Sequence, residues 1–437
     1  MSGVFDGLLC EIGNVGPKAQ AGRVIEVARG ALSVAGLSRQ AVLGDRVSIL
    51  SRRRSVGGEI LRIAENEVIV LPDEAPEGLA IGDAVELVGS AGVSPHDGWI
   101  GRVVDPFGQP LDGRPLFRGP VERPLRAHPP PATQRRAMGD RLSTGVAVFD
   151  TLLPLVRGQR IGLFAGSGVG KSSLLASFAR GVQADVVVIA LIGERGRELR
   201  DFAERVLGPE GMARSVVVAA TSDQSPLIRR RCAWAAMAVA EHFRDEGLQV
   251  LLLADSITRF AEAHREVALA GGEGANMRGS PPSTAHTIMS LAERAGPGPR
   301  DAGDITAVFT VLVAGSDMEE PVADILRGVL DGHVVMDRRI AERGRYPAID
   351  LLRSVSRSLP GCASPEENAL IARARSHLAT WDRAELMIQA GLYARGSDAG
   401  VDAAIRVWPA LDAFLAETAA DGISGSFARL AACLSSG

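Results

Sequence analysis

A glycine-rich segment near the middle of the chain has the residue types and the spacing of a phosphate-binding loop. Residues 165–172 read AGSGVGKS and match the pattern GxxxxGK[ST], with alanine in place of the first glycine. Phosphate oxygens need several converging backbone N–H groups, and only a glycine-rich backbone bends tightly enough to supply them. An apolar run precedes the segment and a helical pattern follows it, which argues against a chance glycine turn that contains a lysine. The phosphate-binding residues that this pattern predicts are Gly166, Ser167, Gly168, Val169, Gly170, Lys171, Ser172 and Ser173.

The lysine of this loop stands out in the composition. Of the 48 basic residues, only Lys18 and Lys171 are lysines. A chain that uses arginine almost everywhere has a compact ammonium at this position, where a planar guanidinium is not equivalent. We expect Lys171 to contact the β- and γ-phosphates of a nucleoside triphosphate and the Ser172 hydroxyl to ligate Mg²⁺. The start of the following helix adds a partial positive charge.

A carboxylate that can complete a Mg²⁺ site follows a second apolar run. Residues 250–255 read VLLLAD, so Asp255 stands where a buried strand is expected to emerge from a sheet. P-loop chemistry needs a carboxylate near the metal. This favours a metal-binding role for Asp255 over the alternative, a cap for the next helix.

Hydrolysis also needs a group that orients or deprotonates water at the γ-phosphate. The apolar run at 186–192 ends in Gly193, Glu194 and Arg195. If this strand and the strand before the P-loop are parallel neighbours, their carboxyl ends place Glu194 beside the phosphates. The alternative is an exposed carboxylate paired with Arg195 or Arg197, and spacing alone leaves both open.

The elements that must position these residues alternate as in an α/β fold. From Gly158 onward, apolar runs of strand length alternate with helical patterns. Because these runs are continuously apolar, we expect a mainly parallel sheet that is buried on both faces. The predicted strands cover 160–164, 186–192, 215–220, 250–254 and 306–313, and the predicted helices begin at 171, lie near 198–206 and cover 226–245.

A different pattern precedes this core. Short runs at 23–28, 32–35, 46–51, 59–64, 67–71 and 84–88 alternate in polarity between Gly, Asn or Asp turns, and they predict a small closed β-barrel. No aromatic residue occurs between Phe5 and Trp99. Single-stranded nucleic acid needs aromatic platforms for its bases, so the barrel is expected to be a structural collar.

The chain turns helical after Pro360. Ser364 and Glu367 have the spacing of a capping box, with proline at the first helical position. The first twenty residues are weakly patterned, and a frayed terminus and a short docking helix both fit them. We expect an N-terminal segment at 1–20, a β-barrel domain at 21–93, an α/β core at 94–362 and a helical domain at 363–437.

Composition excludes several classes of protein. Among the 437 residues, 46% are hydrophobic and 23% charged, and the formal net charge is −4. These values are ordinary for globular domains and give no bulk attraction to nucleic acid or acidic lipid. The four cysteines lie far apart, and no apolar run approaches the ~18 residues that span a bilayer. We therefore expect a cytoplasmic protein that can still dock on a membrane complex.

Five motifs in order resemble one known family. They are AGSGVGKS at 165–172, LIGERGREL at 191–199, LLLADSITRF at 251–260, PVADILRGVLDGH at 321–333 and RYPAIDLLRSVSR at 345–357. Together they resemble the flagellar type III export ATPase, which is similar to the catalytic subunit of rotary ATP synthases. The resemblance extends from residue 22 to the C-terminus. It implies a RecA-like P-loop NTPase core with a mainly parallel sheet flanked by helices, an N-terminal β-barrel, a C-terminal helical domain and a homohexameric ring.

The resemblance also implies roles for individual residues. Glu194 matches the catalytic carboxylate, and Arg195 and Arg259 match residues around the γ-phosphate. Tyr346 is expected to pack on the adenine ring, although ordinary core packing is an alternative. Arg357 matches an arginine finger that enters the site of the neighbouring subunit.

The identity of the arginine finger is open, and two residues depart from the family pattern. Arg353 competes with Arg357 for the role of the finger, and an interface salt bridge is the alternative for either. Family members often carry tyrosine where Phe260 and Ser280 stand here.

The function implied is Mg²⁺-dependent ATP hydrolysis that energises or primes the export of flagellar proteins. The expected partners are further copies of the chain, export-gate membrane proteins, a stator or regulatory protein and complexes of chaperones with export substrates. No specific nucleic acid is expected. The alternatives are a virulence type III secretion ATPase, a catalytic subunit of a rotary ATP synthase, an RNA-translocating hexamer and a nucleotide-binding subunit without turnover.

Overall fold

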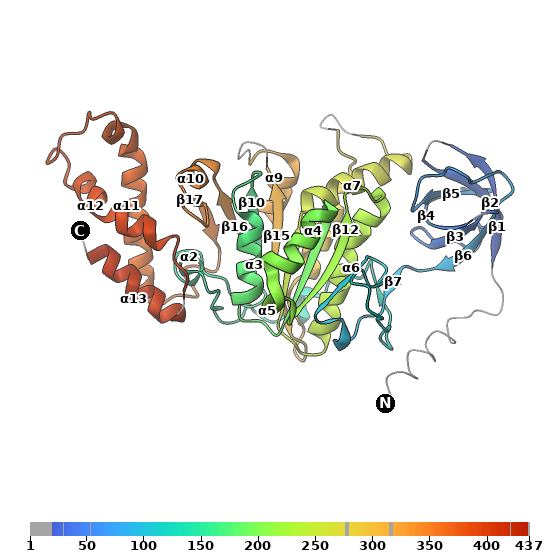
Figure 1. Cartoon of the computed structure of the whole chain (residues 1–437), viewed down its shortest axis with the longest axis horizontal. Coiled ribbons are helices and arrows are strands. Elements are labelled where there is room, and N and C mark those ends of the chain that lie inside the picture. Colours follow the sequence, from blue (N-terminus) through green and yellow to red (C-terminus); the bar gives the residue numbers. More distant parts are fainter. Residues whose placement is uncertain are drawn as a thin grey trace.

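The computed structural model describes residues 20–28, 30–52, 54–275, 279–313, 318–419 and 421–435. Of the predicted segment 1–20, all but Gln20 lies outside these ranges. The molecule is elongated, with the barrel at one end, the α/β core in the middle and a group of helices at the other end (Figure 1).

The N-terminal strands close into a barrel with the order β1-β2-β5-β4-β3-β6. Pairing of β1 with β6 completes the closure. The buried side chains of its core are all aliphatic, among them Val34, Ile49 and Val70. The closed barrel predicted from the sequence is confirmed. Its strands are β1 (Ala21–Val27), β2 (Leu32–Ala35), β3 (Arg46–Leu50), β4 (Ser55–Ile63), β5 (Glu67–Pro72) and β6 (Ala84–Gly89).

The core is built on one large sheet, in which the strands follow the order β17-β16-β10-β15-β13-β11-β12-β8. All neighbours from β16 to β8 pair in parallel, whereas β17 pairs antiparallel with β16 at one edge. The strands are β8 (Arg102–Val104), β10 (Arg160–Ala165), β11 (Val186–Glu194), β12 (Ser215–Thr221), β13 (Val250–Asp255), β15 (Asp304–Leu312), β16 (Gly332–Met336) and β17 (Ile349–Ser356). The short strand β14 (Gly296–Pro297) pairs with β15, and β7 (Gly92–Val93) pairs with β9 (Arg123–Pro124).

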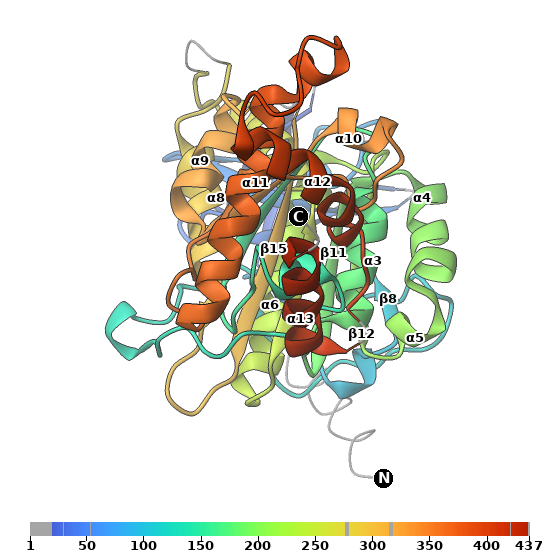
Figure 2. The same cartoon turned by 90° about the vertical axis from the view of Figure 1, so that its left-hand side faces the viewer.

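Helices cover both faces of this sheet, as the apolar strands require. Along β11, Val187, Ile189 and Leu191 belong to one core cluster, and the residues between them belong to the cluster on the other face. Helices α3 to α5 lie on one side of the sheet and α8 and α9 on the other (Figure 2). The helices and helical turns of the core are η1 (Asp97–Trp99), η2 (Ala132–Gln134), α2 (Ala147–Asp150), α3 (Lys171–Gly181), α4 (Gly196–Asp201), the π-helical η3 (Phe202–Leu207), α5 (Gly208–Met212), α6 (Pro226–Asp245), α7 (Ile257–Ala270), α8 (Ser283–Arg294), α9 (Pro321–Val329) and α10 (Arg338–Glu342).

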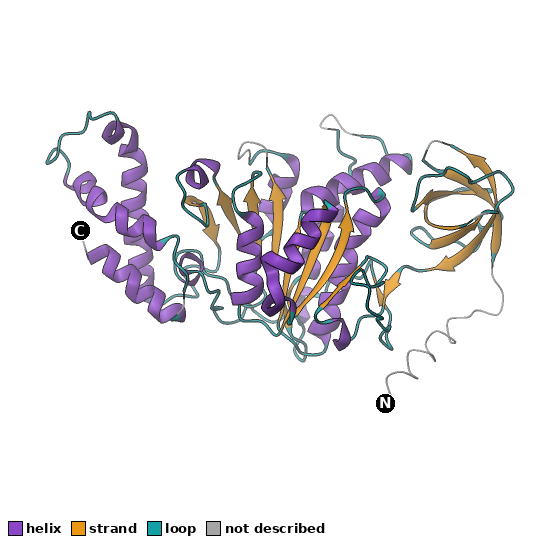
Figure 3. Cartoon of the chain, in the orientation of Figure 1, coloured by secondary structure: helices purple, strands orange, loops and turns teal. Residues whose placement is uncertain are grey.

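All elements of the C-terminal part that the structure describes after β17 are helices (Figure 3). The helices are α11 (Pro365–Gln389), α12 (Ala399–Phe414) and α13 (Gly422–Ser435). The predicted capping box starts α11, since the Glu367 backbone N donates to Ser364 Oγ at 3.2 Å and the Ser364 N donates to Glu367 Oε2 at 2.9 Å. Across the described residues, no helix combines the length and the apolar character needed to cross a bilayer. The predicted fold class, an α/β core between a β-barrel and a helical region, is confirmed.

Four strands of the large sheet were not predicted from the sequence, namely β8, β14, β16 and β17. β8 has only three residues and lies in a region of turns, so it has no recognisable period. β17 carries Asp350 and Arg353 within its eight residues, which breaks the apolar run expected of a central strand. Its place at the sheet edge explains why polar residues are tolerated there.

Candidate active site

The residues predicted to do chemistry meet at the carboxyl edge of the sheet. The P-loop follows β10, Glu194 is the last residue of β11 and Asp255 is the last residue of β13. In the parallel register Leu191 is the Cα partner of Asp255, so the ends of β11 and β13 are adjacent. An open pocket of about 1190 Å³ is lined by P-loop residues 165–173 together with Glu194, Arg195 and Arg259. An adjoining pocket of about 160 Å³ is lined by Ser172, Glu194 and Asp255 among others.

The glycines of the P-loop adopt backbone conformations that other residues avoid. Gly168 has a φ of 76° and Gly170 a φ of 87°, both in the left-handed region. Gly170 is also the N-cap of α3, so the loop leads directly into the start of that helix. Ala165, in place of the usual first glycine, is the buried last residue of β10 and needs no special backbone angle. The departure from the motif therefore leaves the loop intact.

Lys171 and Asp255 form an ion pair at the centre of the site. The Lys171 ammonium pairs with Asp255 Oδ1, and the Thr310 hydroxyl donates to the same oxygen at 2.7 Å. The side chains of Lys171 and Asp255 are only 12% and 5% exposed. The two residues that the sequence assigned to phosphate and metal thus lie in direct contact.

Glu194 has the electrostatic environment of a proton acceptor. Burial disfavours its charged form, and the nearby negative charge of Asp255 adds to this effect. Lys171 opposes the shift only in part, and the pKa of Glu194 is raised to about 7. A carboxyl group that titrates near neutral pH can exchange protons readily with water under cellular conditions.

Two arginines flank Glu194 from separate elements. Arg195 precedes α4, and its Nη1 lies 3.3 Å from Glu198 Oε1. Arg259 lies in the first turn of α7, and its Nη1 lies 2.9 Å from Glu262 Oε2. Exposed pairs of this kind contribute little energy, so both guanidinium groups can turn to a more highly charged partner.

The aromatic ring of Tyr346 lies against the P-loop. A Cβ atom placed on Gly170 would come within 2.9 Å of Tyr346 Cδ1, so only glycine fits beneath the ring. Half of the Tyr346 surface is exposed. Ordinary core packing, the alternative for this residue, does not match that exposure.

The two candidate finger arginines lie in different places. Arg353 on β17 lines the pocket of its own P-loop. Arg357 follows the end of β17, where its backbone N donates to Asp331 O at 3.0 Å and its Nη2 donates to Arg327 O at 3.3 Å. Arg357 does not line that pocket. The geometry thus separates one arginine inside the pocket of the chain from one outside it.

Several residues of the site were missed in the sequence. Thr310 is one of them, although a threonine inside the apolar run of β15 was a usable signal. Others lie on helices and turns whose pattern gives no sign of the pocket. They are Thr258, Glu262, Glu320, Asp337, Arg338 and Arg339.

Comparisons with known proteins agree with this geometry. Residues 145–356 match the model of the ATP synthase alpha/beta family, nucleotide-binding domain, and residues 363–428 match the T3SS EscN ATPase C-terminal domain. The flagellum-specific ATP synthase of Caulobacter vibrioides is 43% identical over 439 residues, covering 98% of this chain and 99% of that protein. The type 3 secretion system ATPase of Xanthomonas euvesicatoria is 42% identical over 399 residues, covering 91% and 89%. The chain belongs to this family of flagellar and type III secretion ATPases.

Solved structures of the family have the same fold. The assembled ATPase EscN of enteropathogenic E. coli matches with a TM-score of 0.87 and 35% identity, over 94% of this chain and 100% of that one. EscN in complex with its central stalk EscO matches with a TM-score of 0.85 and 36% identity over the same shares. The resemblance to the export ATPases predicted from five motifs is confirmed.

Proposed function

We propose that the chain hydrolyses ATP with Mg²⁺ and that a ring of six copies uses this reaction for the export of flagellar proteins. The observation that carries the proposal is the meeting of Glu194 with the paired Lys171 and Asp255 beside the P-loop, where burial and the charge of Asp255 raise the pKa of Glu194 to about 7. A site built only to hold a nucleotide needs no such group. The names of the full-length relatives support the same reaction.

Lys171 exchanges partners when the nucleotide binds. Its ammonium pairs with Asp255 in the structure. A triphosphate in the P-loop presents more negative charge than one carboxylate, so Lys171 turns to the β- and γ-phosphates and Asp255 is released.

Ser172 and Asp255 are the residues that would hold Mg²⁺. A hydroxyl and a carboxylate are hard oxygen ligands of the kind that Mg²⁺ prefers, and both line one small pocket beside the P-loop. When bound, the ion neutralises charge on the phosphates. The Thr310 hydroxyl fixes the Asp255 carboxylate in place.

Glu194 orients the attacking water and accepts its proton. Its position at the end of β11 places it in the same pocket as the P-loop. Arg195 and Arg259 line that pocket too, and we assign them to the γ-phosphate and the Glu194 carboxylate. Tyr346, whose exposed ring lies beside Gly170, packs on the adenine base.

Arg357 completes the site of a neighbouring copy in this proposal. It lies outside the pocket of its own chain, just beyond an edge strand of the sheet. A guanidinium supplied in trans stabilises the charge that develops during phosphoryl transfer, commonly by roughly 10³-fold or more. EscN, a relative with the same fold, was solved as an assembled ATPase, which supports a ring. Arg353, which lines the pocket of its own chain, fits a role in cis.

We propose partners and a location by the same family relationship. The ring works at the cytoplasmic side of the inner-membrane export apparatus. There it meets export-gate proteins, a stator or regulatory protein, and chaperone–substrate complexes. EscN binds a central stalk, EscO, and we propose a comparable stalk for this chain. We also propose that the domain boundaries fall after residues 20, 93 and 362.

The flagellar assignment has one close alternative. A virulence type III secretion ATPase shares the fold and the site, and the relative from Xanthomonas is nearly as similar as the flagellar one. The C-terminal match at 363–428 to the T3SS ATPase model disfavours a rotary ATP synthase subunit. The aliphatic barrel disfavours an RNA-translocating hexamer.

The decisive experiment measures both ATP hydrolysis by the purified chain and motility of the bacterium. Purified full-length chain should release phosphate from Mg²⁺-ATP, and Lys171→Ala should release none above background. Arg180→Ala, in the last turn of the same helix, is the matched control and should retain activity. In the source bacterium, deletion of the gene should abolish motility, which the parent gene but not Lys171→Ala restores. Normal motility with lost secretion of virulence proteins would identify the alternative system.

A further inference from the structure

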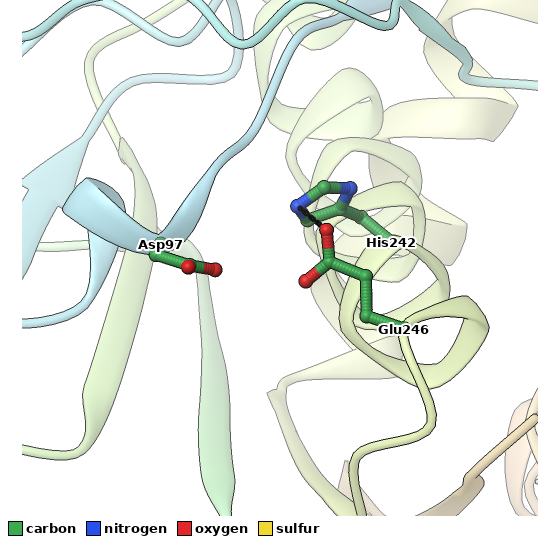
Figure 4. Close-up of side chains that lie close together, drawn as sticks. All are labelled: Asp97, His242 and Glu246. Carbon is green, nitrogen blue, oxygen red and sulfur yellow. Dashed lines mark ion pairs between the residues drawn. The ribbon is translucent and has the colours of Figure 1, made fainter. Parts of the chain in front are cut away.

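Three potential metal ligands meet at the edge of the sheet opposite to the P-loop. Helix α6 starts after the carboxyl end of β12 and ends before the amino end of β13, so its last turn lies far from the phosphates. His242 and Glu246 belong to this end of α6, and Asp97 is the first residue of η1. Figure 4 shows Asp97 facing the other two side chains across a gap. One ligand atom of each residue lies within 4.8 Å of the other two.

His242 lacks the contacts that a buried imidazole normally has. The residue is 6% exposed, and neither ring nitrogen has a hydrogen bond. Its Nε2 faces Glu246 Oε1 at 3.3 Å. An unsatisfied buried polar group is unfavourable, and a ligand on the ring nitrogen would remove this cost. Burial also lowers the pKa of His242 and so favours the neutral imidazole, the form that binds metals.

The two carboxylates have no competing cation. Both Asp97 and Glu246 are exposed, and no lysine or arginine of the described residues forms an ion pair with either. Arg123, whose charge acts on His242, and Arg244 both pair with Asp245 at 2.7 Å. Two negative charges therefore face one neutral imidazole.

We propose that Asp97, His242 and Glu246 bind a divalent first-row transition-metal ion, with Zn²⁺ as the best-fitting probe. One imidazole nitrogen with two carboxylate oxygens suits such ions, whereas Mg²⁺ prefers oxygen ligands alone. Ligands about 2 Å from the ion must lie closer together than 4.8 Å, so the exposed Asp97 side chain turns inward on binding. The bound ion would then link η1 to the end of α6. In the sequence, η1 lies between the barrel and β8.

The test is a Zn²⁺ titration of the full-length chain by calorimetry, without nucleotide and with millimolar Mg²⁺ present. We expect one Zn²⁺ per chain and a higher melting temperature with Zn²⁺. Asp97→Asn and Glu246→Gln should each weaken binding by about tenfold or more, and the double variant should lose the thermal shift. Both changes are at exposed positions, so the variants should fold. His286→Ala, which removes an exposed histidine elsewhere, is the matched control and should bind like the parent.

Two results would overturn the site. One is a parent chain that takes up no Zn²⁺ at micromolar concentration. The other is Zn²⁺ binding that is equally tight in the Asp97→Asn, Glu246→Gln double variant, which would assign the ion to other ligands. Neither result bears on ATP hydrolysis, because the cluster lies at the opposite edge of the sheet.

Discussion

Glu194 shows at the scale of one residue how a catalytic group opposes stability. Its carboxyl is half-buried and lies near Asp255, and these conditions raise its pKa from 4.5 to about 7. Below pH 4.5 the carboxyl is protonated in both the folded and the unfolded chain, and it carries no penalty. As the pH rises through 7, the Glu194 carboxyl of the folded chain ionises although it is partly buried and close to the negative charge of Asp255. The folded chain is therefore less stable above neutral pH than it would be without this charge.

Glu194→Gln should separate catalysis from stability. We expect hydrolysis to fall by about 10²–10⁴-fold, because the water loses its proton acceptor. The nucleotide-free variant should be more stable than the parent at about pH 8, on the order of 1 kcal/mol after allowance for partial exposure. This gain should shrink as the pH falls toward 5. Phosphate release, nucleotide titration and thermal unfolding at several pH values measure these effects. Unchanged hydrolysis would exclude the proposed role.

The sequence predicted the residues of the site unevenly. Glu194 and Asp255 were recognised because each stands where an apolar strand ends, and parallel strands end together, whereas Lys171 was recognised from the glycine-rich loop pattern that follows a strand. Thr310 was missed because a hydroxyl inside a buried strand also fits ordinary packing. Arg353 and Arg357 lie in different places because β17 pairs antiparallel with β16 at the edge of the sheet. The spacing of residues in the sequence does not predict this pairing.

At the scale of elements, one carboxylate joins the barrel to the core. Glu59 on β4 accepts hydrogen bonds from Arg126 Nη2 at 2.7 Å and from Arg230 Nη2 at 2.8 Å. Arg230 belongs to α6 and is 4% exposed, and its guanidinium lies 4.9 Å from the ring centre of Trp234. Burial lowers the pKa of Arg230 to about 10, so this cation depends on Glu59 for its charge balance.

Glu59→Gln should loosen the attachment of the barrel. The amide keeps the shape but removes the negative charge, and Arg230 remains as a buried cation. We expect a loss of roughly 2–4 kcal/mol in the free energy of unfolding, together with faster proteolysis in the segment after β6. Glu65→Gln, at an exposed turn of the same barrel, is the control and should change little. Equal stability of the two variants would contradict this role of Glu59.

Elements with a clear period were the ones that the sequence predicted. All six barrel strands and the long helix α6 were predicted to within a few residues, because their patterns repeat over their whole length. β8 and β17 were not, since one is very short and the other is polar. Their places are set by neighbouring strands rather than by their own residues.

At the scale of the whole molecule, the proposed site needs two chains. Two inactive variants can then complement each other. Lys171→Ala keeps a good arginine finger, and Arg357→Ala keeps a good P-loop. In a mixed ring, about one quarter of the interfaces combine the intact halves and should hydrolyse ATP.

The measurement is phosphate release from the two variants alone and after mixing under assembly conditions. Each variant alone should be inactive, and Arg357→Ala should still bind nucleotide with nearly the affinity of the parent. Mixing Lys171→Ala with Arg353→Ala is the matched control, and no recovery is expected because both residues serve one pocket. Recovery in the control but not in the Arg357 mixture would reverse the assignment.

The scarcity of lysine has a practical consequence for labelling. Because Lys171 and Lys18 are the only lysines in the sequence, an amine-reactive ester has few targets besides the terminal amine. Acylation of Lys171 would silence the enzyme, and bound ATP should shield it, so such reagents become footprinting probes for occupancy of the pocket. Conversely, cross-linkers that join two amines will scarcely capture neighbouring copies, and reagents that couple carboxyl groups are the better choice for trapping the assembly.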